Sequence, residues 1–153
     1  MIHAQQQFEI CSMLRSELKA APWNPRKIDE GAKKKLKSNL KRVGLLRPLV
    51  LNKRTGHLIA GHQRLSQMDA IEKGDYRLDV AVVDLDEKTE QEQIIFLNNP
   101  AVMGTYDFKA LAKLLPGVEL ENCGFEPMDM KLLLPEFEIG MSDAEKDLSL
   151  IHI

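Results

Sequence analysis

The stretch RPLVLNKRTGHLIAGHQRLSQM, residues 47–68, constrains the fold more than any other part of this chain. Two short apolar runs, residues 48–52 and 57–60, flank the turn sequence KRTG, a pattern typical of a β-hairpin. Beyond Gly61 the apolar residues recur at helical spacing. The second strand is therefore expected to pass through Gly61 directly into a helix.

A junction of a strand, a glycine and a helix is a suitable place to bind an anion. The first N–H groups of the helix have no partner within it, the positive end of the helix dipole lies at the turn, and Gly61 lets a ligand approach. The first helical turn adds the imidazole of His62, the amide of Gln63 and the guanidinium of Arg64. A guanidinium fork suits phosphate. We therefore predict a phosphate site formed by these four residues and Arg26.

The segment before Arg26 is expected to be stiff. Pro22 and Pro25 hold the residues before them in extended conformations, so Arg26 should project in a fixed direction. Trp23 is the only tryptophan of the chain. We expect it to be a partly buried anchor of this loop rather than a base-stacking side chain.

A helix with two unlike faces is predicted next, beginning at the N-cap Asp29 and ending at Gly44. Apolar residues recur along one face, at Ala32, Leu36, Leu40 and Val43. Cationic residues occupy the other face, at Lys33, Lys34, Lys35, Lys37, Lys41 and Arg42. Lysines in such an arrangement contact a phosphate backbone and specify little sequence. The predicted DNA-backbone contacts are Lys33, Lys34, Lys37 and Lys41.

The net charge of −2 conceals an uneven distribution. Residues 26–64 hold twelve Lys and Arg against two acids, a surplus of +10, whereas residues 65–153 hold seven against nineteen, a surplus of −12. A basic segment of this density attracts phosphates over a long range. The alternative is that the lysines only keep an exposed helix soluble.

The rest of the chain predicts further strands and short helices. Residues 9–14 are expected to form a strand, and residues 78–85 a buried central strand rich in β-branched side chains. A helix over 89–98 should place Ile94, Ile95 and Leu97 inward, and shorter helices are expected at 107–115 and 127–134. The acids between the central strand and the first of these helices, Asp84, Asp86 and Glu87, are interpreted as helix-capping and solubilising groups rather than as a metal site.

With 153 residues and 44% hydrophobic side chains, the chain is expected to bury one core. We predict a flexible N-terminus (1–8), a main domain (9–100), a short helical extension (101–137) and a mobile acidic tail (138–153). No apolar run approaches the roughly 18 residues of a membrane span, and no signal peptide is evident, so a cytoplasmic location is expected. There, Cys11 and Cys123 should be reduced and partly buried.

Three motifs resemble those of the ParB/sulfiredoxin superfamily, specifically the ParB-like N-terminal domain. PLV followed by IAGHQRL is similar to its hairpin and signature turn. LKAAPWNPRK is similar to its "Asn-Pro-Arg" entry segment, and KRVGLLRP to the link between a helix and the first hairpin strand. The resemblance covers roughly residues 10–99 and is strongest to stand-alone domains of phage or mobile-element type. It implies an α+β fold with a small mixed sheet and helices packed around it.

The resemblance also implies a nucleotide site, typically for CTP with Mg²⁺. Arg26, Arg64 and Asn99 match its binding positions. The chain departs from the family pattern because His62 and Gln63 replace Glu-Arg in the turn, and Asn98 replaces a Glu. Loss of the carboxylate weakens Mg²⁺ binding and water activation. The sulfiredoxin branch uses a cysteine where this chain has His62, so that chemistry is not expected.

We therefore expect a ParB-like module that binds a nucleotide, DNA phosphates or both, in a phage or plasmid DNA process. Two alternatives stay open. One is a phosphate-chemistry enzyme of the same fold, nuclease or kinase-like, with His62 as the candidate catalytic residue, either as a general acid or as a hydrogen-bond donor to phosphate. The other is an accessory module of a DNA methyltransferase. No metal ligands are predicted within the protein itself.

Overall fold

The structure is a computed structural model that describes residues 3–125. The predicted helix at 127–134 and the predicted acidic tail at 138–153 lie outside the described residues. The chain divides into two compact units, Met1–Met103 and Gly104–Ile153. The predicted site residues all belong to the first unit.

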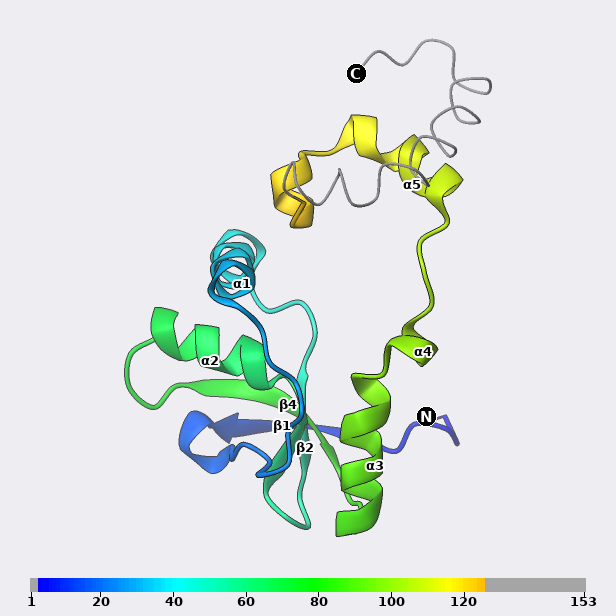
Figure 1. The fold of residues 1–153 in the computed structure, drawn as a ribbon. Helices are drawn as coiled ribbons and strands as arrows, with labels where there is room; N and C mark the ends of the chain where they lie inside the picture. The colour runs from blue at the N-terminus through cyan, green and yellow to red at the C-terminus, as the bar shows by residue number, and fades with distance from the viewer. Residues whose placement is uncertain (1–2, 126–153) are drawn as a thin grey trace. The chain divides into compact units, whose positions relative to one another are not determined.

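The first unit contains a four-stranded mixed sheet with the strand order β1-β4-β2-β3 (Figure 1). Its strands are β1 (Glu9–Leu14), β2 (Leu49–Asn52), β3 (His57–Ala60) and β4 (Arg77–Val83). β1 pairs antiparallel with β4, β2 pairs parallel with β4, and β2 and β3 form the antiparallel hairpin. The α+β class, the mixed sheet and the central position of β4 are thus as predicted.

β4 ends two residues before the predicted end of its strand, and Asn52 provides the reason. The backbone N–H of Leu85 donates to Asn52 Oδ1 at 2.9 Å, and Asn52 Nδ2 donates to the Leu85 carbonyl at 2.9 Å. A side-chain amide therefore replaces the neighbouring strand as the partner of Leu85.

The sheet is covered on both faces, because alternate residues of its strands point to opposite sides. On one face Leu49, Leu58 and Val80 pack with Leu65 of helix α2 (His62–Ile71). On the other face Ile59 packs with Ile94 of helix α3 (Glu87–Leu97). Figure 1 shows α2 and α3 on different sides of the strands. The β3-α2-β4 crossover makes the parallel β2-β4 pair possible.

Helix α1 (Glu30–Val43) begins and ends as predicted and packs against α2. Asp29 caps it by accepting a hydrogen bond from the Ala32 N–H at 2.7 Å, and Gly44 follows its last residue with φ of 82°. α4 (Pro100–Met103) completes the first unit. In the second unit, α5 (Phe108–Leu114) is capped by Asp107, close to the predicted bounds. Short 3₁₀ turns occupy Arg15–Glu17, Leu115–Gly117 and Leu120–Cys123.

The prediction that Ile94, Ile95 and Leu97 all face inward was wrong for two of them. Ile94 is fully buried, but Ile95 is 60% and Leu97 49% exposed. Ile95 is about 100° around the helix axis from Ile94, so the two cannot share one stripe. Leu97 is the last residue of α3. The residue that shares the inward face with Ile94 is Glu90, one turn earlier and also fully buried.

Both cysteines are free thiols, but only Cys11 is partly buried and Cys123 is exposed. None of the helices in the described part of the chain has the length and apolarity needed to span a membrane.

Candidate anion-binding site

The junction of β3 and α2 depends on Gly61. This residue caps α2 in the left-handed conformation, with φ of 102° and ψ of 13°, which L side chains rarely adopt. A Cβ at this position would overlap Leu49 Cδ2 and lie 3.2 Å from Arg64 Nη2. The absence of a side chain therefore lets the core pack against the junction and lets the Arg64 guanidinium lie beside it.

Arg64 is the cation nearest to the start of α2. Its Nη1 donates to the backbone carbonyl of Arg47 at 2.6 Å, which holds the guanidinium across the end of the helix. Burial lowers the pKa of Arg64, and the positive charges of Arg47 and Arg26 lower it further. Arg64 is thus close enough to both Arg47 and Arg26 to be repelled by each, and an anion beside Arg64 would offset that repulsion.

These residues surround a hollow of about 110 Å³, which we call the anion hollow. Its lining residues are Asn24, Arg26, Leu36, Arg47, Gly61, His62, Gln63 and Arg64. The structure therefore brings together the predicted Arg26, Gly61, His62, Gln63 and Arg64. Sequence reasoning missed Asn24 and Arg47, although Arg47 belongs to the link before β2 and is one of the basic residues of the positive segment.

His62 is held by the segment that carries Arg26. Its Nε2 accepts a hydrogen bond from the Ala21 backbone N–H at 3.1 Å, and burial lowers its pKa. The ring is therefore neutral near pH 7, with its proton on Nδ1. His62 can therefore donate a hydrogen bond from Nδ1, whereas its Nε2 already accepts one from Ala21. Trp23, from the same segment, packs edge-on against the ring of His57.

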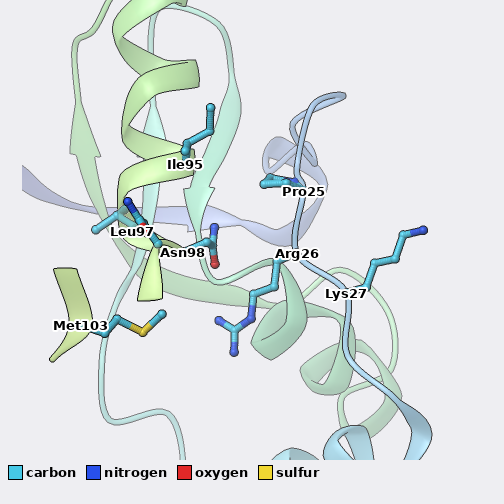
Figure 2. Close-up of a pocket in the computed structure, with 8 residues that line it drawn as sticks. Pro25, Arg26, Lys27, Ile95, Leu97, Asn98 and Met103 are labelled. Carbon is cyan, nitrogen blue, oxygen red and sulfur yellow. The ribbon is translucent and has the colours of Figure 1, made fainter. Parts of the chain in front are cut away.

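A second, wider hollow of about 680 Å³ shares Arg26 with the first; we call it the wide hollow. Its lining residues are Pro25, Arg26, Lys27, Ile95, Leu97, Asn98, Asn99 and Met103. In Figure 2, Arg26 extends from the proline-containing segment toward the end of α3, whereas Lys27 points away. Asn99, predicted with the phosphate-binding residues, lines this wide hollow and not the anion hollow. Arg26 lines both. The exposed Ile95 and Leu97 form part of its wall.

The two asparagines of the wide hollow have fixed amide orientations. Asn98 Nδ2 donates to the Ile94 carbonyl at 2.8 Å, which leaves its Oδ1 as an acceptor. Asn99 Oδ1 accepts from the Ala101 N–H at 3.0 Å, which leaves its Nδ2 as a donor. One acceptor, one donor and apolar walls suit a flat polar ring.

The predicted DNA-contacting lysines are spread over α1 and differ in exposure. Lys34 and Lys41 are exposed, whereas Lys33 and Lys37 are partly buried at the border of the apolar stripe. Lys33 Nζ also pairs with Glu30 Oε1 at 3.2 Å. The outer face of α1 thus presents Lys34 and Lys41 most directly.

The acids near the start of α3 have structural partners, as interpreted from the sequence. Asp86 Oδ1 accepts from the Thr89 N–H at 2.7 Å and caps α3, and Asp84 pairs with Arg54 at 3.0 Å. Over residues 3–125, no cluster of three or more His, Cys, Asp or Glu side chains is placed to hold a metal ion.

A buried polar network at the other end of the hairpin was not predicted. The carboxylate of Glu90 accepts from Asn52 Nδ2 at 2.9 Å and from the Thr55 hydroxyl, and its Oε2 lies 3.0 Å from His57 Nδ1. Burial raises the pKa of Glu90, but the hydrogen bonds from Thr55, Asn52 and His57 outweigh it and hold the pKa below its usual value. His57, in β3, is partly buried, with a side chain that is 22% exposed. The sequence does contain one signal for this network: Glu90 lies four residues before Ile94, on the inward face of α3.

Comparison with known proteins shows the fold. No family model matches the chain, and no curated protein sequence matches it. The structure is similar to that of the C-terminally truncated chromosome-partitioning protein ParB from Caulobacter crescentus complexed with CTP-gamma-S, with a TM-score of 0.58, 17% identity, and coverage of 93% of this chain and 79% of that one. A Pnob8-like ParB-N domain matches with a TM-score of 0.47 and 15% identity, over 92% of this chain and 63% of that one. The fold of this chain is ParB-like.

Proposed function

We propose that this chain is a nucleotide-binding module. In this proposal the anion hollow holds the phosphates, the wide hollow holds the ribose and base, and Arg26 contacts the ligand between them. The observation that carries the proposal is the convergence of Arg26, Arg47 and Arg64 on one hollow at the start of α2. Guanidiniums gathered at the positive end of a helix favour a ligand with negatively charged oxygens.

The sizes of the two hollows support a division of the ligand. The anion hollow, at about 110 Å³, has room for a few phosphate oxygens but not for a base and ribose. The wide hollow, at about 680 Å³, has the volume typical of small-molecule sites and contributes apolar walls and two oriented amides. CTP is the first nucleotide to test, because the similar Caulobacter structure contains CTP-gamma-S.

Binding is a better proposal than catalysis for this site. The lone pair on His62 Nε2 is already taken by the Ala21 N–H, so His62 has no free base nitrogen. Neither hollow is lined by a carboxylate that could activate water or a hydroxyl. The enzyme alternative, nuclease or kinase-like, therefore lacks a general base among the described residues that line the site.

A nucleotide screen tests the proposal. Thermal unfolding should shift upward with at least one of CTP, UTP, ATP and GTP, because a ligand that binds only the folded state stabilises it. Arg64→Ala should abolish the shift. Arg54→Ala, at the opposite end of the same hairpin and outside both hollows, is the matched control and should preserve it. A shift retained in Arg64→Ala, or absent from the wild type with all four nucleotides, would contradict the proposal.

DNA backbone binding by α1 is a second candidate function, supported by the exposed Lys34 and Lys41. Duplex binding should weaken steeply with added salt, since each neutralised phosphate releases counterions. The double variant Lys34→Ala/Lys41→Ala should reduce the salt slope by about 2, whereas Lys88→Ala on α3 should leave it unchanged. An unchanged slope in the double variant would exclude this face of α1. We place the module in phage or plasmid DNA metabolism, because IAGHQRL (residues 59–65) and LNNP (residues 97–100) resemble stand-alone domains of that kind.

A further inference from the structure

We infer that this site binds its nucleotide as a metal-free polyphosphate, with arginines taking the place of a divalent cation. The inference rests on the proposed function and concerns the form of the ligand. It differs from the sequence resemblance, which implies a nucleotide together with Mg²⁺. The residues of the site do not fit that ion.

The charges that line the two hollows all have one sign. Arg26, Lys27, Arg47 and Arg64 are cationic, and the polar residues among the others are neutral: Asn24, His62, Gln63, Asn98 and Asn99. No Asp or Glu lines either hollow in the described part of the chain. Proteins usually bind nucleotide-associated Mg²⁺ through one or two carboxylates in addition to the phosphates. The carboxylate ligands that Mg²⁺ would need are therefore absent from the described lining of both hollows.

The neutral groups at the site are also committed to other contacts. His62 accepts the Ala21 N–H through Nε2 and keeps a proton on Nδ1, so neither ring nitrogen has a lone pair available for a metal ion. Asn98 donates to the Ile94 carbonyl, a bond that a carboxylate at this position could not make. These two residues stand at the positions where the family pattern has a Glu.

The charges of the site also favour a nucleotide without Mg²⁺. Arg64 lies within the repulsive field of Arg47 and Arg26 and is itself partly buried. A phosphate chain without a metal presents its full negative charge and relieves this repulsion. A phosphate chain that carries Mg²⁺ has two fewer negative charges and brings a cation among the guanidiniums, so its attraction should be weaker.

Isothermal titration of the full chain with CTP, UTP, ATP and GTP, each in excess EDTA and in excess MgCl₂, tests the inference. The nucleotide that binds is expected to do so at least as tightly in EDTA as in MgCl₂. Binding that occurs only with MgCl₂ would overturn the inference and leave the proposed function intact. Binding of no nucleotide in either condition would overturn the proposed function, and this inference with it.

A matched pair of variants at position 98 provides a second test. Asn98→Glu introduces a carboxylate, which should weaken binding in EDTA by repelling the phosphates, and MgCl₂ should restore it. Asn98→Gln has the same length without the charge and should gain no dependence on the metal. Equal metal dependence of the two variants would contradict the inference. If either variant fails to fold by circular dichroism, the wild-type comparison decides alone.

Discussion

The two ends of the β2-β3 hairpin differ in whether their charged side chains have partners of complementary charge or polarity. At the turn end, the buried carboxylate of Glu90 is matched by Asn52, Thr55 and His57. At the Gly61 end, three guanidiniums gather around a hollow that no acid lines in the described residues. We call these the matched end and the cationic end.

This difference separates structural polar groups from functional ones. A buried charge with a full set of partners holds elements together, and here it joins the hairpin to α3. Charges of one sign that face one another in a hollow contribute repulsion to the fold, which a bound anion converts into attraction. Changes at the matched end should therefore affect stability, and changes at the cationic end should affect binding.

The largest expected effect is the loss of Glu90. Glu90→Ala removes the acceptor of three hydrogen bonds, one each from Asn52, Thr55 and His57. Because hydrogen bonds to a charged group contribute about 1.5–3 kcal/mol each, the free energy of unfolding should fall by about 3–5 kcal/mol. Urea denaturation measures this loss. Glu90→Gln, which keeps the shape and one acceptor oxygen, should lose less. A loss below about 1 kcal/mol in Glu90→Ala, the range of an exposed pair, would remove the distinction between the two ends.

The next effect is conformational and belongs to the cationic end. Gly61→Ala must place a side chain at φ of 102° and against Leu49, and strain of this kind costs about 1–3 kcal/mol for the backbone alone. Gly56→Ala is the control, because Gly56 also has a positive φ, of 77°, but has no atom within 4 Å of the added Cβ. Denaturant unfolding should show the larger loss for Gly61→Ala. Equal losses would mean that close packing at the junction is unimportant.

Arg47→Ala should change binding rather than folding. It removes one charge from the anion hollow while leaving the backbone carbonyl that Arg64 contacts. Nucleotide affinity should fall about tenfold to a hundredfold, as expected for a charge-assisted hydrogen bond of about 1.5–3 kcal/mol. The unfolding free energy should stay the same or rise slightly, because a like charge near Arg64 is gone. A clear loss of stability with unchanged affinity would reverse the roles given to the two ends.

Acid should weaken the matched end. The pKa of Glu90 is held below its ordinary value by its hydrogen bonds, so its contribution to stability is present above the ordinary carboxyl range and is lost as the pH falls through the lowered pKa. Urea midpoints measured from pH 7 down to pH 3 should decline less steeply in Glu90→Gln than in the wild type. Parallel declines would assign the acid sensitivity to other groups, such as Asp69, whose pKa is lowered by its hydrogen bond from Arg15.

The smallest effect is expected for the exposed pair of Arg54 and Asp84, at the turn of the same hairpin. Both side chains are about half exposed, at 54% and 50%, so water screens their attraction and Arg54→Ala should leave the urea midpoint almost unchanged. The same urea experiment measures it. A change as large as that of Glu90→Ala would show that burial does not distinguish these carboxylates.

The features that were predicted correctly from the sequence are those set by residues close together in the chain. The hairpin turn, the Asp29 cap, the Gly44 end and the Gly61 junction involve residues within a few positions of one another, and each has a distinct turn or cap chemistry. The placement of Gly61, His62, Gln63 and Arg64 in one hollow follows directly from that junction. Arg26 was also predicted there, from the stiffness of the segment before it.

What the sequence did not predict depends on contacts between distant segments. Glu90 meets Asn52 across 38 positions, and an acid in a helix is ordinarily expected on the exposed face. Arg47 joins the site because its carbonyl receives Arg64, 17 positions later. The outward Ile95 and Leu97 could not be separated from Ile94 by hydrophobicity alone, because the wall of the wide hollow is itself apolar.

Amide chemical shifts of the isotope-labelled chain during titration with CTP, and with the other three nucleotides in turn, test the central claim most directly. Saturating nucleotide should move the amide signals of Gly61, His62, Gln63 and Arg64, while those of residues 53–56 at the matched end stay in place. Shifts confined to residues 53–56, or no shifts with any of the four nucleotides, would contradict it.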